Sequence, residues 1–276
     1  MFVGTARAVV AAALAAVALT LTRQHLPQGI AWARLAVVAA GVVVGFPVLT
    51  SFALETAPAG HSAVVIGLLP AATAVAAVLR TGEQPPVAFW FAAAAGALCT
   101  VVFALSAGGG TLTLHWSDLL LFLAVVAGAV GYAEGGLLSR ELGAWQTISW
   151  ALVVAAPLML VLAGTSLLTQ PQGGTPGSWA AFAYLGVVSM FLGFFAWYRG
   201  LSIGPMTRVS QVQLVQPVMT ICWAALLLHE RVTWLTVMGG VAVIACAAGA
   251  VVVRSQRSGG NARTRTPTTI SSAKQR

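Results

Sequence analysis

Charged side chains are scarce in this sequence. Asp, Glu, Lys and Arg make up 7% of its 276 residues, whereas ordinary soluble domains contain about 25%. Hydrophobic residues make up 59% and form long, near-continuous runs. About 20 such residues cross a bilayer core, and a backbone within lipid must satisfy its own hydrogen bonds. The composition therefore excludes a soluble protein and predicts an all-α integral membrane protein.

The sequence also lacks the residues that several kinds of chemistry require. Lys274 is the only lysine, so there is no GxxxxGK[ST] phosphate loop, and ATP-driven pumping by this chain is excluded. No pair of Asp residues suits a metal-dependent membrane transferase, and no HExxH motif or Ser/His pairing within a span suggests a membrane protease. We therefore expect no enzyme activity and no cofactor.

Cysteines are few and scattered. Cys99, Cys222 and Cys246 lie inside apolar runs, with no CxxC motif and no His at ligand spacing. This pattern predicts neither a disulfide framework nor a zinc site, and we expect no metal.

Apolar runs bounded by charge, Pro or Gly predict nine membrane spans. They lie near residues 6–22, 31–53, 58–79, 86–106, 117–138, 146–168, 178–198, 207–228 and 234–253. Residues 255–276 form a basic, Ser/Thr/Gly-rich tail whose composition predicts disorder. We interpret its charge as a cytoplasmic retention signal, with anionic lipid as a second possibility and nucleic acid as an unsupported one.

The positions of the basic residues predict the orientation, because cytoplasmic loops of membrane proteins are enriched in Lys and Arg. If the tail is cytoplasmic and the spans alternate, twelve of the 14 basic residues lie on the cytoplasmic side. Besides Arg254 and the five basic residues of the tail, these are Arg23, Arg34, Arg80, Arg140, Arg199 and Arg208. We therefore expect a multi-pass protein of the cell membrane with a cytoplasmic C-terminus.

One spaced skeleton occurs twice, offset by 147 residues. Its anchors are Leu54, Pro58, Pro70 and Glu83 in one copy and Leu201, Pro205, Pro217 and Glu230 in the other. The same offset maps the last four predicted spans onto the first four, whereas the span at 117–138 has no counterpart. Because five crossings separate equivalent spans, the copies have opposite orientations, as in the inverted repeats of secondary transporters. We therefore divide the chain into a first repeat (1–106) that lacks its first helix, a second repeat (117–254) and the tail.

The segments ALETAPAGHSAVVIGLLPAATAVAAVLRTGE and GLSIGPMTRVSQVQLVQPVMTICWAALLLHE resemble the EamA-type domain of the drug/metabolite transporter superfamily. In that domain an A/G-L start, a mid-helix Pro and a closing Glu recur in each repeat. The resemblance covers roughly residues 5–254 and implies a ten-helix carrier with a central cavity. It further implies a secondary exporter of small metabolites such as amino acids, nucleosides or drugs, working by alternating access.

The first helix of the family pattern has no counterpart in this sequence. We expect the start to have been placed too late; a nine-helix variant is the other explanation. The alternative function is that of a non-transporting membrane subunit completed by another chain. The expected partners are a small-molecule substrate and the lipid bilayer, and homo- and hetero-oligomers both remain open.

Several polar or helix-breaking residues within spans are candidates for the substrate cavity. They are Pro70 and Pro217, which should kink or unwind their helices, together with Ser210, Gln213, Gln216, Tyr132 and Trp150. Gln213 and Gln216 share a helix face, where amides either join helices or bind substrate. The alternative for the prolines is that Pro is simply common in membrane helices, and the alternative for the aromatic residues is packing.

The acidic residues fall into two groups. Glu134 is the one carboxylate clearly within a span, and it is a candidate for proton coupling or for pairing with Arg140. Glu83 and Glu230 end the two skeletons and are predicted to cap the next helix; with Pro58 and Pro205 we regard them as structural repeat positions. Trp197 and Tyr198, followed by Arg199, fit an aromatic belt at the membrane interface.

Overall fold

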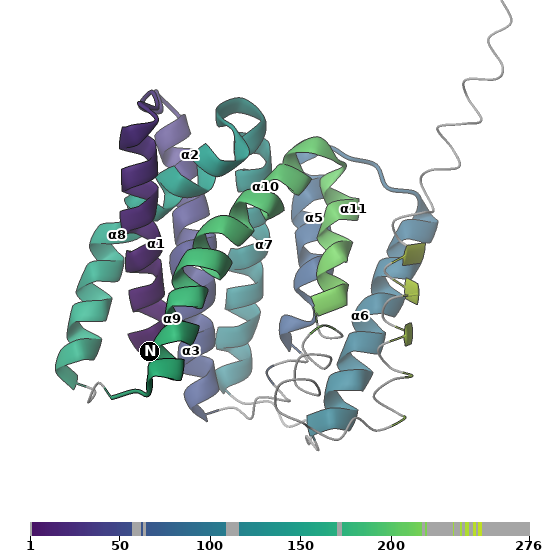
Figure 1. Ribbon diagram of the computed structural model, residues 1–276. Coiled ribbons are helices and arrows are strands. Elements are labelled where there is room, and N and C mark those ends of the chain that lie inside the picture. Colours follow the sequence, from purple (N-terminus) through teal and green to yellow (C-terminus); the bar gives the residue numbers. More distant parts are fainter. Residues whose placement is uncertain are drawn as a thin grey trace, which may run out of the picture.

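The computed structural model describes residues 2–56, 62, 65–108, 116–169 and 173–216, with nine single positions between 219 and 249. Within these residues all regular secondary structure is helical (Figure 1). The helices are α1 (Phe2–Leu21), α2 (Ala31–Val38), η1 (Ala39–Gly45), α3 (Phe46–Thr56), α5 (Leu69–Thr81), α6 (Val87–Gly108), α7 (Trp116–Leu142), α8 (Ala144–Thr169), α9 (Pro176–Tyr184), η2 (Leu185–Leu192), α10 (Gly193–Ile203), α11 (Met206–Gln211) and η3 (Val212–Leu214).

Five continuous helical segments in the described part are long and apolar enough to cross a membrane. They are Phe2–Leu21, Ala31–Thr56, Trp116–Leu142, Ala144–Thr169 and Pro176–Ile203. Each coincides with a predicted span, and the shorter apolar helices α5 and α6 lie in two others. Pro157 lies inside α8 without ending it, as membrane helices allow when neighbouring groups satisfy the freed backbone. The predicted spans at 207–228 and 234–253 fall largely outside the described residues, so the number nine stays a prediction.

The described helices show the same segmentation twice. In the first half, α2 is followed by the π-helix η1 and then by α3; in the second, α9 is followed by the π-helix η2 and then by α10. The bounds of α3 (Phe46–Thr56) and α10 (Gly193–Ile203) differ by 147 residues at both ends. Because π-helices are rare, their recurrence at equivalent positions supports the internal duplication inferred from the sequence.

The long helix α7 runs through the middle of the bundle and packs against helices of both halves (Figure 1). Its glycines allow the close approach: a Cβ on Gly131 would lie 2.6 Å from Cγ2 of Val42, and a Cβ on Gly41 would collide with the carbonyl oxygen of Ala127. Such small residues are typical of helix contacts in lipid, where there is no hydrophobic drive to associate. The equivalent helices α1 and α8 pack together in the same manner through buried alanines, among them Ala8, Ala11, Ala15, Ala151 and Ala155.

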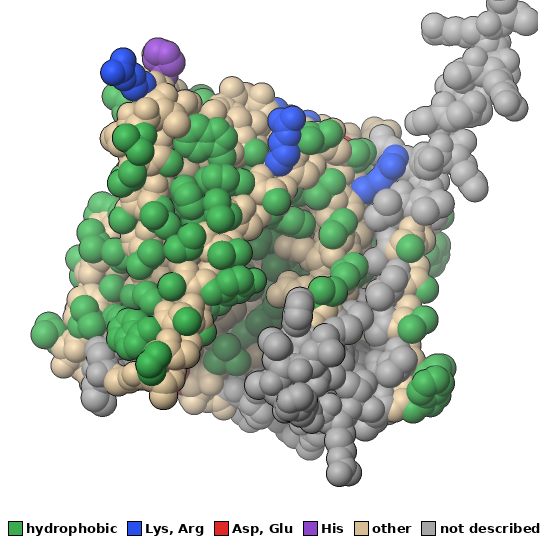
Figure 2. Space-filling view, in the orientation of Figure 1, with side chains coloured by type: hydrophobic (Ala, Val, Ile, Leu, Met, Phe, Trp, Pro, Cys, Tyr) green, Lys and Arg blue, Asp and Glu red, His purple; other side chains and the backbone are tan. Residues whose placement is uncertain are grey.

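The face shown in Figure 2 is largely apolar, and its basic side chains lie towards one end. Figure 2 shows hydrophobic side chains over the visible face, with the visible Lys and Arg side chains towards its upper end. Leu21, Leu79 and Leu168 are each at least 79% exposed, as expected for side chains that face lipid rather than water. The same face is hollowed between α10 and the region of α11 (Figure 2).

Candidate transport site

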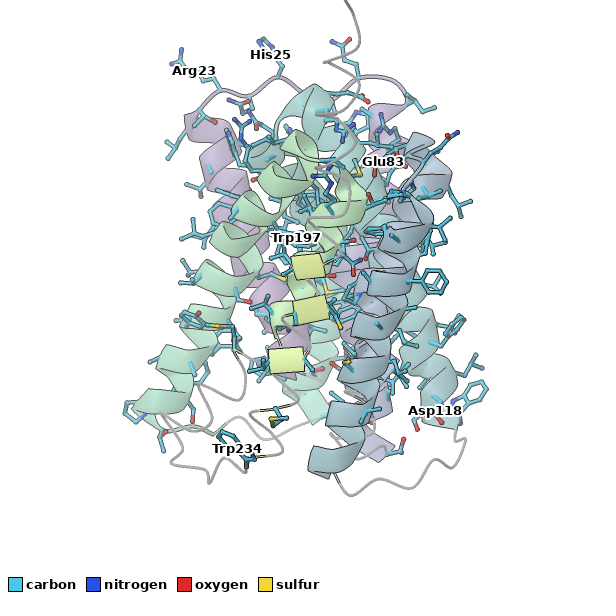
Figure 3. All side chains as sticks on the ribbon, turned by 90° about the vertical axis from the view of Figure 1, so that its right-hand side faces the viewer. Arg23, His25, Glu83, Asp118, Trp197 and Trp234 are labelled. Atoms are coloured by element: carbon cyan, nitrogen blue, oxygen red, sulfur yellow. The ribbon has the colours of Figure 1, made fainter. Side chains whose placement is uncertain are left out.

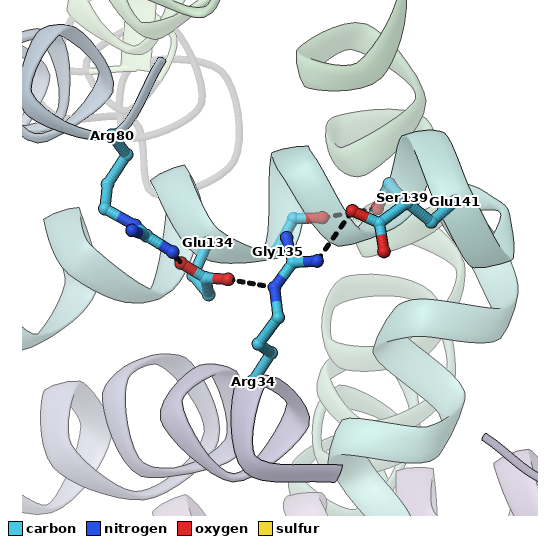
Figure 4. Close-up of polar contacts among 6 residues, drawn as sticks. All are labelled: Arg34, Arg80, Glu134, Gly135, Ser139 and Glu141. Carbon is cyan, nitrogen blue, oxygen red and sulfur yellow. Dashed lines mark hydrogen bonds and ion pairs between the residues drawn. The ribbon is translucent and has the colours of Figure 1, made fainter. Parts of the chain in front are cut away.

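An ion-pair cluster lies at the arginine-rich end of the bundle, around Glu134 of α7 (Figure 4). One carboxylate oxygen accepts from Nε of Arg34 in α2, and the other accepts from Arg80, in the last turn of α5, with an Nε–Oε2 distance of 2.8 Å. Nη1 of Arg34 also donates to Glu141 over 2.6 Å. The Glu134 side chain is only 5% exposed, so its charge is compensated by two guanidinium groups rather than by water.

Glycines of α7 around Glu134 admit neighbouring helices on other sides of the carboxylate. Gly131 lies against Val42 of η1, Gly135 against Tyr198 of α10, and Gly136 against Met206 of α11. Gly82, with φ +67°, ends α5 in the left-handed conformation that glycine adopts readily. The predicted pairing of Glu134 with Arg140 is wrong, because Arg140 turns away and its Nη2 donates to the carbonyl of Gly204 over 3.3 Å.

Glu83 makes a second contact between distant parts of the chain. Its carboxylate accepts from the backbone N–H groups of Met206 (3.0 Å) and Thr207 (3.2 Å) and from Oγ1 of Thr207 (2.7 Å). These groups form the first turn of α11, where unpaired N–H groups attract negative charge. Glu83 thus caps a helix, as predicted, but the helix is α11 of the second half. The prediction that it caps the next helix along the chain, α6, is wrong. Pro205 precedes α11 in extended conformation, whereas Pro58 and Glu230 lie outside the described residues.

The helix break predicted at Pro70 is present. Gly67 and Leu68 form a turn, and α5 begins at Leu69 with proline in its first turn, where the missing N–H costs no hydrogen bond. The side chain of Gln211 donates from Nε2 to the carbonyl of Pro70 over 3.3 Å. The broken helix of the first half is therefore joined to a buried amide of the second; Pro217 lies outside the described residues.

Gln211 is the buried amide that the sequence did not single out. It is fully buried, its Nε2 lies 3.3 Å from Oγ of the equally buried Ser210, and its Oε1 has no hydrogen-bond partner. Gln213 is half-buried with an unpartnered Oε1, and Gln216 is exposed. Residues 212–214 form the 3-10 turn η3, in which residues three apart also lie on one face, so the turn does not separate the faces of Gln213 and Gln216.

The aromatic candidates form two ring clusters. Tyr132 of α7 packs edge-on against Trp197 of α10 with ring centroids 5.4 Å apart, whereas Trp150 of α8 packs edge-on against Trp32 of α2 at 5.7 Å. The predicted interfacial position of Trp197 and Tyr198 is wrong. Tyr198 is fully buried and donates to the carbonyl of Gly131 over 3.4 Å, and Trp197 lies about midway along the bundle in Figure 3, with Nε1 buried and unpartnered.

Comparisons with known proteins agree with this architecture. Residues 115–252 match the EamA-like transporter family. The chain is 45% identical, over 258 residues, to the Bacillus subtilis (strain 168) protein named "Uncharacterized transporter YdeK", with 91% of this chain and 86% of that protein covered. A solved crystal structure with 19% identity superposes at a TM-score of 0.73 over 91% of this chain and 88% of its own, which shows the shared fold. The chain therefore belongs to the EamA-like transporter family and is a multi-pass membrane transporter.

Proposed function

We propose that the protein is a secondary carrier that exports small metabolites by alternating access, and that the structure represents a state closed at its arginine-rich end. The observation that carries this proposal is the set of polar contacts between the two halves at that end. Glu134 of the second half binds Arg34 and Arg80 of the first, and Glu83 of the first half caps α11 of the second. We call these two contacts the arginine-end gate.

The arginine-end gate has the features that a reversible closure needs. Its contacts join the halves through ion pairs and hydrogen bonds at one end, where Figure 3 places Glu83, Arg23 and His25. Alternating access requires one end to close while the substrate site opens to the other. Such contacts can exchange with water when they separate, whereas a packed apolar interface would have to expose its side chains.

We propose that the substrate site lies among the unpartnered polar atoms of α10, α11 and η3. Gln211 Oε1, Gln213 Oε1 and Trp197 Nε1 are buried polar atoms without a partner, and Tyr132 packs against Trp197. One donor, two amide acceptors and aromatic rings suit a small polar or amphiphilic solute such as an amino acid, a nucleoside or a drug. Pro70 adds a helix break of the kind that exposes backbone groups to substrates in transporters.

We propose that the protein lies in the cell membrane and that its arginine-rich end faces the cytoplasm. Arg34, Arg80 and Arg140 lie in the described polar contacts of that end, and Arg23 lies at the same end in Figure 3. The positive-inside rule assigns such an end to the cytoplasm. The gate would then be cytoplasmic, and opening it would admit a substrate for export.

Glu134 is the proposed link between the gate and a proton gradient. Neutralising its carboxylate with a proton would remove the charge that holds Arg34 and Arg80, so gate opening and proton uptake occur at one residue. The Glu134→Gln variant should therefore lose gradient-driven transport and keep counterflow. Unchanged gradient-driven transport by this variant would rule out proton coupling through Glu134 and leave the substrate gradient as the driving force.

Export itself is tested by overexpressing the full chain in cells challenged with toxic analogues of amino acids and nucleosides. We expect resistance to at least one compound, with lower intracellular accumulation of that compound. Glu141→Gln is the matched control for Glu134→Gln, because Glu141 also pairs with Arg34 but its side chain is 57% exposed. Equal accumulation with and without the protein across the panel would count against an exporter of these classes.

One observation favours the alternative of a non-transporting subunit completed by another chain. Gly41 and Val42 of η1 are buried beneath α7, whereas their counterparts in η2, Val188 and Ser189, are exposed. The face of η2 equivalent to the α7-binding face thus has no helix over it among the described residues. A subunit role predicts a stable hetero-complex on mild extraction and no flux from the protein purified alone.

A further inference from the structure

Cys99 and Cys246 meet across the bundle, although 147 residues separate them in the sequence. Their Sγ atoms lie 4.0 Å apart, and both side chains are half-buried. The separation equals the offset of the internal duplication, so the two thiols occupy equivalent positions in the two halves. Equivalent positions that touch each other must lie at the pseudo-two-fold axis that relates the copies.

The position of the pair along the helices agrees with that axis. Cys99 lies near the middle of α6, and in inverted-repeat transporters the axis runs in the plane of the membrane. Gly96, one turn before Cys99, brings the backbones close: a Cβ there would lie 3.5 Å from Cβ of Cys246 and 2.8 Å from Cδ1 of Leu214. The contact between the thiols therefore follows from the close approach of the two chain segments that carry them.

We propose that Cys99 and Cys246 form a dithiol modification site at the axis, which closes to a disulfide when it meets a lipid-permeant disulfide oxidant. One thiol attacks the oxidant, forms a mixed disulfide and releases the first reduced half as a thiol. The second cysteine then attacks the protein sulfur of the mixed disulfide and releases the other half. The two cysteines lose two electrons and two protons, which reduce one oxidant molecule to two thiols.

The position at the axis also predicts how the site behaves during transport, a step that rests on the proposed alternating access. If the two halves exchange conformations, the distance between equivalent residues is the same before and after the exchange. The disulfide should therefore form to the same extent in the protein with an intact gate and in the Glu83→Ala/Glu134→Gln variant. Disulfide formation itself requires no transport, so its failure is distinguishable from failure of the proposed function.

The test treats the Cys222→Ala variant of the full chain, in membranes, with 2,2′-dithiodipyridine and measures the intact mass. We expect a chain that has lost two hydrogen atoms and carries no thiopyridyl group, and a peptide that joins Cys99 to Cys246. Chains that carry a thiopyridyl group on each cysteine would overturn the proposal. Cys99→Ser in the same background should retain one group, which shows that the reagent reaches Cys246, and Gly96→Leu should reduce disulfide formation several-fold because it separates the helices.

Discussion

At the scale of single residues, the sequence identified where charge is buried but not what compensates it. Glu134 is recognisable as a carboxylate within a span, yet its partners Arg34 and Arg80 are 100 and 54 residues away, and only the packing of α2 and α5 on α7 brings them together. The nearby Arg140 was the natural partner by sequence and is not the actual one. Gln211 was missed for a comparable reason, because packing against neighbouring helices, and not spacing, decides which amide of the QVQLVQ segment is buried: Gln211 is buried, Gln213 is half-buried and Gln216 is exposed.

The Glu134→Gln variant should lower the free energy of unfolding by about 2–3 kcal/mol, because it leaves Arg34 without its buried counter-charge. Thermal unfolding in detergent measures the loss. Glu141→Gln is the control and should change stability by less than about 0.5 kcal/mol, since that side chain is largely exposed and surface pairs contribute little. Equal effects of the two substitutions would show that Glu134 is not the centre of the cluster.

At the scale of helices, apolar runs placed the described spans to within a few residues, because long uninterrupted hydrophobic segments in lipid have no alternative to the helix. The π-helices η1 and η2 were not predictable, since nothing in the runs AAGVVVG and LGVVSMFL marks the extra residue. The glycines in these runs are the feature of the sequence that indicates close helix contact. Gly41 of η1 lies directly against the backbone of α7, so helix contact depends on the absence of a side chain there.

Gly41→Ala should therefore destabilise the protein by about 2 kcal/mol, because the added Cβ collides with the backbone of α7 and forces the helices apart. Gly164→Ala in α8 is the matched control. No atom lies within 4 Å of a Cβ at Gly164, so the exchange should be neutral or stabilising by up to about 1 kcal/mol. Thermal unfolding of both variants in one detergent provides the comparison, and a neutral Gly41→Ala would refute the close contact.

The helix cap at α11 gives a second prediction at this scale. Glu83→Ala removes three hydrogen bonds to the first turn of α11 and should cost about 1 kcal/mol of stability. Glu55→Ala, at an exposed position near the end of α3, should cost almost nothing. If hydrogen exchange of the α11 amides is no faster in Glu83→Ala than in Glu55→Ala, the cap does not hold that helix.

At the scale of the whole molecule, the offset of 147 residues predicted more than any single motif. It anticipated two copies with the same segmentation, which α2–η1–α3 and α9–η2–α10 display. The contacts between the copies could not be derived from the sequence, because they depend on how the halves are oriented in space. The Glu83 cap, the arginine cluster and the Cys99–Cys246 contact all belong to this class.

The proposed orientation of the molecule rests on the placement of its basic residues and can be tested directly. A fluorescent protein fused after Arg276 should fold and fluoresce in the cytoplasm, and a periplasmic reporter such as alkaline phosphatase at the same site should be inactive. The physical reason is the bias of Arg and Lys towards the cytoplasmic side. An active phosphatase fusion would invert the orientation and place the arginine-end gate on the outside.

If the arginine-end gate opens, the two halves move apart at that end, and a distance between them measures this most directly. Spin labels would be attached to Gln84→Cys and Ile203→Cys, both exposed and outside the gate contacts, after replacement of the three native cysteines by serine. In liposomes we expect one dominant distance with the gate intact and an added, longer distance in the Glu83→Ala/Glu134→Gln variant. The same single distance in both proteins would contradict the gate and, with it, this account of alternating access.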